Sequence, residues 1–165
     1  MSIDTANLRW LWLSLGVLVV DQLTKWAALA GLTYARPVEV LPFFSLTLLY
    51  NTGAAFSFLA DHDGWQRWFF VFLAVVITAA LTAWLAFVAI RDWRIRAGIT
   101  AVIGGAVGNV IDRVAYGHVV DFLDFHVAGW HWPAFNIADA AITIGVALII
   151  WAELRPAGRE NASDE

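Results

Sequence analysis

Two aspartates, Asp121 and Asp139, occupy positions where a carboxyl group can do chemistry. Each lies near the end of an apolar segment that is long enough to enter a membrane. Ionisable groups are costly near a bilayer, so their presence there favours a functional role. Two carboxyl groups held close together share one proton, and the ionised member can activate a water molecule. The pair therefore predicts hydrolysis by a membrane-embedded aspartic peptidase.

Three polar residues precede Asp121 on one predicted helix. Asp112 and Arg113 follow Asn109 by three and four positions, so both lie on the same face of that helix as Asn109. The amide of Asn109 needs hydrogen-bond partners within hydrocarbon, and we expect it to face the interior of the helix bundle. Asp112 and Arg113 also have a simpler interpretation, as charges that mark the helix end at the lipid headgroups.

Asp139 taken alone also fits a structural role. Asn136 as an N-cap with Asp139 three residues later resembles a capping box, and a carboxylate suits the N-terminus of a helix. This interpretation does not explain why Asp121 accompanies Asp139 just outside the adjacent span. Asp124, three residues after Asp121, is interpreted as a solvated loop residue.

Polar groups that could support the site also occur earlier in the chain. Asp21 and Lys25 are four residues apart in the first apolar segment and can pair on one helical face. They either neutralise each other at the interface or support a site. Asn51, followed by Thr52 and Gly53, is a turn residue by default, with a role in the site as the alternative.

Other chemistries have weaker support. A zinc site would draw on His118, His126, His131, Asp121 and Asp124, but no HExxH or similar spacing occurs on a predictable helix. No Gly-x-Ser-x-Gly motif indicates a serine mechanism. The chain has no cysteine, which excludes disulfides and thiolate nucleophiles. We expect neither a metal nor a cofactor.

Composition determines the class of the chain. Hydrophobic residues make up 61% of its 165 residues, whereas soluble domains have about 45–50%. The mean hydropathy is +0.69. We therefore predict one integral membrane domain over residues 1–155, with helices at about 8–32, 68–90, 97–114 and 136–153. Residues 156–165 are expected to be a disordered cytoplasmic tail.

The segments between these helices differ from each other. Residues 34–65 contain two early prolines and many β-formers, so we expect short strands folded against the membrane surface. Residues 117–135 are expected to form a loop. The third helix has the spacings Gly104-xxx-Gly108 and Ala101-xxx-Gly105, which favour close contact with neighbouring helices.

Arginines predict the orientation of the four spans. Four spans place both termini on one side, together with a tight loop expected at 91–96. Most arginines then share that side and few oppose it: Arg9, Arg91, Arg94, Arg96, Arg155 and Arg159, against Arg36 and Arg113, with Arg67 at the edge. The positive-inside rule therefore makes both termini cytoplasmic. Asp121 and Asp139 then lie at the extracytoplasmic surface.

Four segments resemble the signature blocks of lipoprotein signal peptidases, also called signal peptidase II. They are VDQLTK (20–25), NTGAAFS (51–57), GNVIDRVAYGHVVDF (108–122) and FNIAD (135–139). The blocks occur in the family's order without a departure at a motif position. The resemblance covers essentially the whole chain between its tails.

The resemblance implies an all-α membrane protein with four transmembrane helices and a small extracytoplasmic β-cradle, in the bacterial cell (inner) membrane. It implies an aspartic endopeptidase that removes the signal peptide from diacylglyceryl-modified prolipoproteins, cutting before the lipidated cysteine. Asp121 and Asp139 match the catalytic pair. Residues that bind substrate or support the pair are matched by Asn51, Gly53, Asn109, Arg113, Asn136, Asp21 and Lys25. The expected partners are these substrates and membrane lipid, with no nucleic acid, and the chain is expected to be monomeric.

Two other functions remain open at this level. A small membrane transporter or proton pathway also uses intramembrane carboxylates with a lysine partner. It would predict inverted repeats and charges at mid-bilayer, whereas this sequence shows no clear repeat and its charges cluster toward one face. A structural assembly subunit would tolerate Asp121→Asn without loss of any activity.

Overall fold

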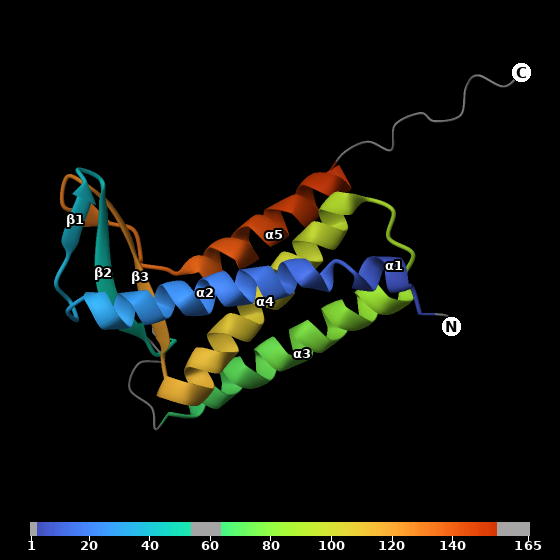
Figure 1. Ribbon diagram of the computed structural model, residues 1–165, viewed down its shortest axis with the longest axis horizontal. Helices are drawn as coiled ribbons and strands as arrows, with labels where there is room; N and C mark the ends of the chain where they lie inside the picture. The colour runs from blue at the N-terminus through green and yellow to red at the C-terminus, as the bar shows by residue number, and fades with distance from the viewer. Residues whose placement is uncertain (1–2, 54–63, 155–165) are drawn as a thin grey trace, which may run out of the picture.

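Four long helices and one small sheet make up the fold (Figure 1). The computed structural model describes residues 3–53 and 64–154, so the expected tail and the 54–63 part of the strand region lie outside the described residues. In chain order the elements are α1 (Thr5–Leu8), α2 (Leu11–Gly31), β1 (Val38–Leu41), β2 (Phe44–Asn51), α3 (Trp65–Phe87), α4 (Trp93–Tyr116), β3 (Val119–Val127), β4 (Trp130–His131) and α5 (Ile137–Leu154). The sheet lies at one end of the bundle, and α1 and the C-terminal end of α5 lie at the other.

The helices are long and apolar enough to cross a membrane over Thr5–Gly31, Trp65–Phe87, Trp93–Tyr116 and Ile137–Leu154. The third of these begins earlier than expected, inside the stretch that we expected to be a tight loop. Asp92 is its N-cap, and the carboxylate accepts a hydrogen bond from the Arg94 N–H at 2.8 Å. The cap satisfies one of the free N–H groups of the first turn, and so allows α4 to start at Trp93.

Polarity is distributed inside out in comparison with a soluble domain. Helix α4 is in contact with α2, α3 and α5, and 67% of its membrane-spanning stretch is buried. This stretch nevertheless has the lowest mean hydropathy of the four spans. Helix α3 has the highest mean hydropathy of the four spans, and only 6% of its membrane-spanning stretch is buried. Lys25, Asp21 and Asp112 are among the most completely buried side chains. Apolar surface facing outward and charges facing inward are what a hydrocarbon solvent requires.

Small residues let α4 approach its neighbours closely, which confirms the predicted close contacts. A Cβ atom added at Gly104 would lie 2.6 Å from the backbone oxygen of Ser14 on α2. One added at Gly108 would lie 2.5 Å from Oδ2 of Asp21, also on α2. On the other side of α4, Gly105 packs against the backbone of Ala138 on α5. The glycines therefore bring the backbone of α4 up to the polar groups of both helices.

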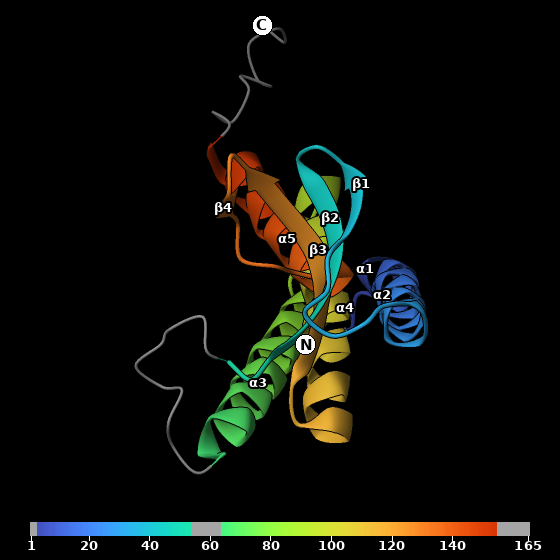
Figure 2. The same ribbon diagram turned by 90° about the vertical axis from the view of Figure 1, so that its left-hand side faces the viewer.

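The sheet is antiparallel, in the order β1-β2-β3-β4, and β2 and β3 lie side by side in Figure 2. Our expectation of a loop over 117–135 was wrong, because most of it is strand β3 and the short strand β4. Pairing with β2 satisfies the backbone of β3 by contacts that are distant in sequence. The register between the two strands shifts by one residue between Leu46 and Leu49, where β2 has a β-bulge.

Replacement of Gly104 tests the close approach of α4 to α2. Gly104→Ala forces the new methyl group against the Ser14 carbonyl, and we expect a loss of about 1–3 kcal/mol of unfolding free energy, as for other overpacked sites. Thermal unfolding in detergent measures it. Gly16→Ala is the matched control, since a Cβ atom there meets nothing within 4 Å. Equal unfolding temperatures for the two variants would contradict the packing.

Candidate active site

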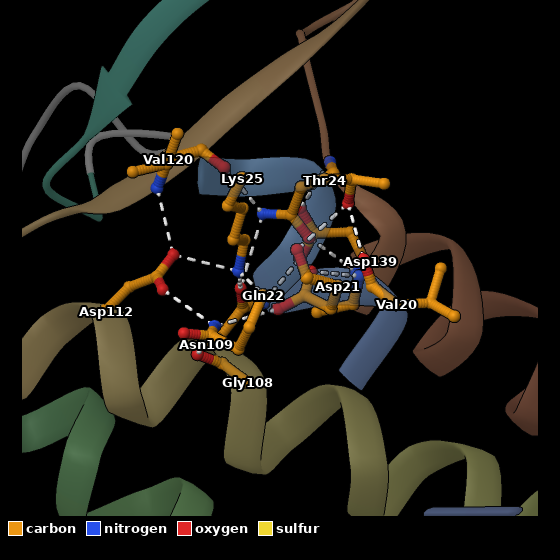
Figure 3. A network of polar contacts seen from close by, with 12 residues as sticks. Val20, Asp21, Gln22, Thr24, Lys25, Gly108, Asn109, Asp112, Val120 and Asp139 are labelled. Carbon is orange, nitrogen blue, oxygen red and sulfur yellow. Dashed lines mark hydrogen bonds and ion pairs between the residues drawn. The ribbon is translucent and has the colours of Figure 1, made fainter. Parts of the chain in front are cut away.

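A buried ammonium group lies at the centre of a polar network between the helices and the sheet (Figure 3). Nζ of Lys25 is 2.9 Å from Oδ2 of Asp21, 2.8 Å from Oδ2 of Asp112 and 3.0 Å from Oδ1 of Asn109. Each of its three donors therefore has an acceptor. The side chain of Lys25 is 2% exposed and those of both aspartates 1% or less. The predicted Asp21–Lys25 pair is confirmed, and Asp112 completes it.

Both aspartates also bind backbone groups of other elements. Oδ1 of Asp21 accepts a hydrogen bond from the N–H of Ala138, in the first turn of α5, at 2.9 Å. Oδ2 of Asp112 accepts one from the N–H of Val120, on β3, at 3.1 Å. The amide of Gln22 donates to both carboxylates, at 3.2 Å and 3.1 Å. The network thus fixes the starts of α5 and β3 against α2 and α4.

Asp139 is held at the N-terminus of α5. Its backbone N–H donates to Oδ1 of Asn136 at 2.9 Å, and its Oδ2 accepts from the N–H of Asn136 at 3.3 Å, which is the predicted capping box. The amide of Asn109 donates to its Oδ1 at 2.8 Å. The structural interpretation of Asp139 therefore holds, and the same contacts aim its carboxyl group at the site.

Asp121 lies on β3 with 2% of its surface exposed. The amide of Asn136 donates to its Oδ1 at 2.7 Å, and the side chain of Asn51 also hydrogen-bonds to it. Burial raises the pKa of Asp121 to about 7, and the nearby charge of Asp139 adds to this effect. The two asparagines and Lys25 oppose the rise, because they stabilise the ionised form. Asp121 and Asp139 are thus close enough to influence each other's ionisation.

Three asparagine side chains lie around the two carboxyl groups, and each turns its NH₂ group toward them. The Oδ1 atoms of Asn51, Asn109 and Asn136 accept hydrogen bonds from the Gly53 N–H, from Lys25 Nζ and from the Asp139 N–H, respectively. Their NH₂ groups are thereby left to donate to carboxylates. Asn51 is consequently both a turn residue and a partner of the pair, so its two interpretations are compatible.

Arg113 and Gly53 form the side of the site near α3. The guanidinium of Arg113 lies 5.3 Å from the ring centroid of Phe70 and is near enough to interact with Asp139, Asp121 and Asp112. Gly53 has φ +101°, and a Cβ atom there would lie 2.6 Å from the Phe70 ring. Glycine is needed at this turn for its backbone conformation and for the space that the ring takes up.

The structure overturns the interpretation of Asp124 and decides between the two interpretations of Asp112. Asp124 is not a solvated loop residue, because it is 6% exposed and accepts hydrogen bonds from Thr47 and His131. Asp112 does not mark a helix end at the headgroups, because it is 1% exposed and paired with Lys25. Its spacing of three residues from Asn109 was the available signal.

The histidines considered as zinc ligands lie apart from the carboxyl pair. His131 pairs with Asp124 at 2.8 Å and His126 with Ser45 at 3.0 Å, and the ring of His118 packs against that of Tyr50 at a tilt. Within residues 3–53 and 64–154, no three histidine, aspartate or glutamate side chains converge to hold a metal ion. The chemistry that this arrangement allows is proton transfer between two carboxyl groups, water and a bound substrate.

Solved structures of bacterial membrane enzymes share this fold. One, described as "Bacterial membrane enzyme structure by the in meso method at 2.3 A resolution", has a TM-score of 0.81 at 33% identity, covering 95% of this chain and 94% of its own. A second, described in the same way at 1.9 A resolution, has a TM-score of 0.80 at 35% identity and covers 90% and 94%. The fold is therefore that of a membrane enzyme.

Sequence comparison narrows this class to a family. The family model described as Signal peptidase (SPase) II matches residues 13–155. The lipoprotein signal peptidase of Polynucleobacter necessarius subsp. necessarius (strain STIR1) is 50% identical over 155 residues, which is 94% of each chain. That of Azoarcus sp. (strain BH72) is 53% identical over 150 residues, covering 91% of this chain and 85% of its own. The chain belongs to the signal peptidase II family, a family of membrane proteases.

Removal of the buried ammonium group tests the network. Lys25→Met leaves two buried carboxylates without their counter-charge, and we expect a loss of about 3–5 kcal/mol of unfolding free energy. Thermal unfolding in detergent is the measurement. Arg36→Met, which removes an exposed cation close to the sheet, should stay within about 0.5 kcal/mol of wild type. A Lys25→Met protein as stable as the Arg36→Met protein would refute the role of the network.

Proposed function

We propose that the chain is a lipoprotein signal peptidase that works by an aspartic mechanism. Its substrates are prolipoproteins modified with diacylglycerol, and it cleaves the peptide bond before the lipidated cysteine. The observation that carries the proposal is the placement of Asp121 and Asp139, which three asparagine amides hold together between α4, α5 and the sheet. Family membership supports the substrate class, and the geometry supports the mechanism.

In the proposed mechanism the pair begins with one proton. We assign that proton to Asp121, because its buried environment disfavours the charge and raises its pKa to about 7. Asp139 is the ionised member, stabilised by the N-terminus of α5 and by the amide of Asn109. It removes a proton from a water molecule, which attacks the scissile carbonyl carbon.

The second half of the reaction returns the protons. Asp121 donates its proton toward the carbonyl oxygen as negative charge develops there. These two steps give a tetrahedral diol. As its C–N bond breaks, the proton taken by Asp139 goes to the leaving nitrogen, and one hydroxyl proton of the diol returns to Asp121 as the C=O bond reforms, which restores the pair with one proton. The aspartates titrate as a pair, and the fixed asparagine donors spare the site from reorganising during the reaction. All these groups belong to one chain, so a monomer suffices.

The membrane orientation is also part of the proposal. The site lies at the sheet end of the bundle. At the opposite end, Arg91 lies in the connection between α3 and α4, and Arg94 and Arg96 lie in the first turn of α4. Arg94 and Arg96 stack on Trp151 and Trp10, as expected for side chains at a membrane–water interface. We place this end in the cytoplasm and the site at the extracytoplasmic face of the bacterial inner membrane.

Cleavage by carboxamide variants tests the mechanism. Asp121→Asn and Asp139→Asn keep the shape of the side chains but cannot shuttle a proton, and each should lower the cleavage rate by at least about a hundredfold. The assay uses a purified diacylglyceryl-modified prolipoprotein with a chelator present throughout.

Glu39→Gln, an exposed carboxyl group on β1, is the control and should cleave normally. Folded variants that still cleave, or a wild type that the chelator inactivates, would overturn the aspartic mechanism. A wild type that cleaves nothing, but conducts protons in vesicles, would instead establish the proton-pathway alternative.

The pH dependence follows from the state of Asp121. Its carboxyl group must be protonated to act as the acid, and its pKa is about 7. The value of kcat/KM should therefore fall as the pH rises through about 7, approaching tenfold per unit. A pH series with the same substrate measures this limb. A rate that rises through pH 7 instead would reverse the roles of the two aspartates.

Single cysteines test the orientation, because the natural chain has none. Glu39→Cys lies at the sheet end and Arg91→Cys at the opposite end, and both positions are exposed. The cells have an intact inner membrane, and any outer membrane is permeabilised. A membrane-impermeant maleimide should then label Glu39→Cys in these cells, and Arg91→Cys only after lysis. The opposite labelling pattern would invert the proposed topology.

A further inference from the structure

The mechanism leaves one buried carboxyl group of the sheet without a role. Asp124 is on β3, three residues after Asp121, and 6% of its surface is exposed. Its Oδ2 accepts a hydrogen bond from Oγ1 of Thr47 on β2 at 2.9 Å, and its Oδ1 is 2.8 Å from Nδ1 of His131 on β4. Asp124 therefore links the two strands that flank its own.

Thr47 lies inside the β-bulge of β2. Ser45 and Leu46 pair with Asp124 and Leu123, but Leu49 pairs with Asp121, so Thr47 and Leu48 together face a single residue of β3. Thr47 is 6% exposed and Leu48 is 3% exposed. A bulge inserts one extra residue and re-aims every side chain beyond it.

The bulge decides which way Asn51 points. If the register of Ser45 with Asp124 continued without a bulge, Asn51 would oppose His118 and would lie on the other face of the sheet from Asp121. A slip of one residue moves a side chain to the opposite face, because side chains alternate along a strand. In the observed register Asn51 opposes Val119, on the same face as Asp121, and hydrogen-bonds to its carboxyl group.

We propose that Thr47 and Asp124 are positioning residues for the reaction: their buried hydrogen bond fixes the bulge in β2, and the bulge brings Asn51 to Asp121. Neither residue touches the reacting atoms. A buried hydroxyl group and a buried carboxyl group need partners, so each stabilises the conformation in which it meets the other. The inference rests on the proposed function, because its readout is the titration of Asp121 during cleavage.

Charged groups lie near both Asp121 and Asp124, and those that face Asp121 also influence its pKa. Asp121 faces Asp139 of α5 and Lys25 of α2, and Arg113 of α4 is also near. Asp124 faces His131 of β4, whose ring is 5.0 Å from that of His126. Replacing Thr47 changes none of these charges. A shifted titration of Asp121 would therefore come from the loss of a hydrogen bond.

The experiment is a double-mutant cycle on the pH profile of cleavage. The Asn51 hydrogen bond lowers the pKa of Asp121, so its loss moves the falling limb of kcat/KM to higher pH. Asn51→Ala and Thr47→Val should each raise the midpoint by about one pH unit. The double variant should match Asn51→Ala alone, because both changes remove the same contact. Thr47→Ser keeps the hydroxyl group and should restore the wild-type limb.

Two controls separate positioning from general destabilisation. Thr33→Val, an exposed threonine, should leave the limb unchanged. If Thr47→Val does not fold, His131→Phe replaces it as the test. This change removes the second hydrogen bond to Asp124 at a half-exposed position, and it should also move the falling limb of kcat/KM to higher pH.

Additive shifts in the double variant, or a Thr47→Val protein with the wild-type limb and a lower unfolding temperature, would overturn the inference. Either result leaves the proposed function intact. A wild type that does not cleave at all is the separate failure of the proposed function.

Discussion

The buried ammonium group of Lys25 is the constraint on which the rest of the structure depends. A charge taken out of water is costly unless opposite charges and hydrogen bonds surround it. Lys25 obtains these partners only where α2 and α4 lie together, because Asp21 is on its own helix and Asp112 and Asn109 are on α4. The glycines of α4 make this approach possible, since a side chain at Gly108 would collide with Asp21.

The same charge reaches the carboxyl pair through hydrogen bonds. Lys25 donates a hydrogen bond to the side-chain oxygen of Asn109, so the NH₂ group of that amide donates to Asp139. Asp21 and Asp112 each bind a backbone N–H group, one at the start of α5 and one in β3, next to the catalytic candidates. The network therefore couples helix packing to the placement of two carboxyl groups that come from different elements. Such fixed donors are the preorganisation that charge-developing reactions require.

The fold suits a reaction at the boundary between lipid and water. Many apolar side chains on the outside of the helices are exposed, and the buried network of Lys25, Asp21 and Asp112 lies where α2 and α4 meet strand β3. A protein dissolved in hydrocarbon must satisfy its polar groups internally, which is why Lys25, Asp112 and Asn136 are among its most buried residues. Burial within the site raises the pKa of Asp121, the carboxyl group that acts as the acid in the proposed mechanism.

Much of this could be read from the sequence, because it depends on local properties. Hydropathy over windows of about 20 residues indicated the four spans, and spacing indicated the Asp21–Lys25 pair and the capping box of Asp139. Strand β3 and the burial of Asp112 and Asp124 could not be read in this way. A strand that pairs with a distant segment has no periodic signal of its own when it is buried on both faces. Whether an aspartate is solvated, paired or titrating near neutrality depends on what packs against it, and those partners come from helices and strands far away in the chain.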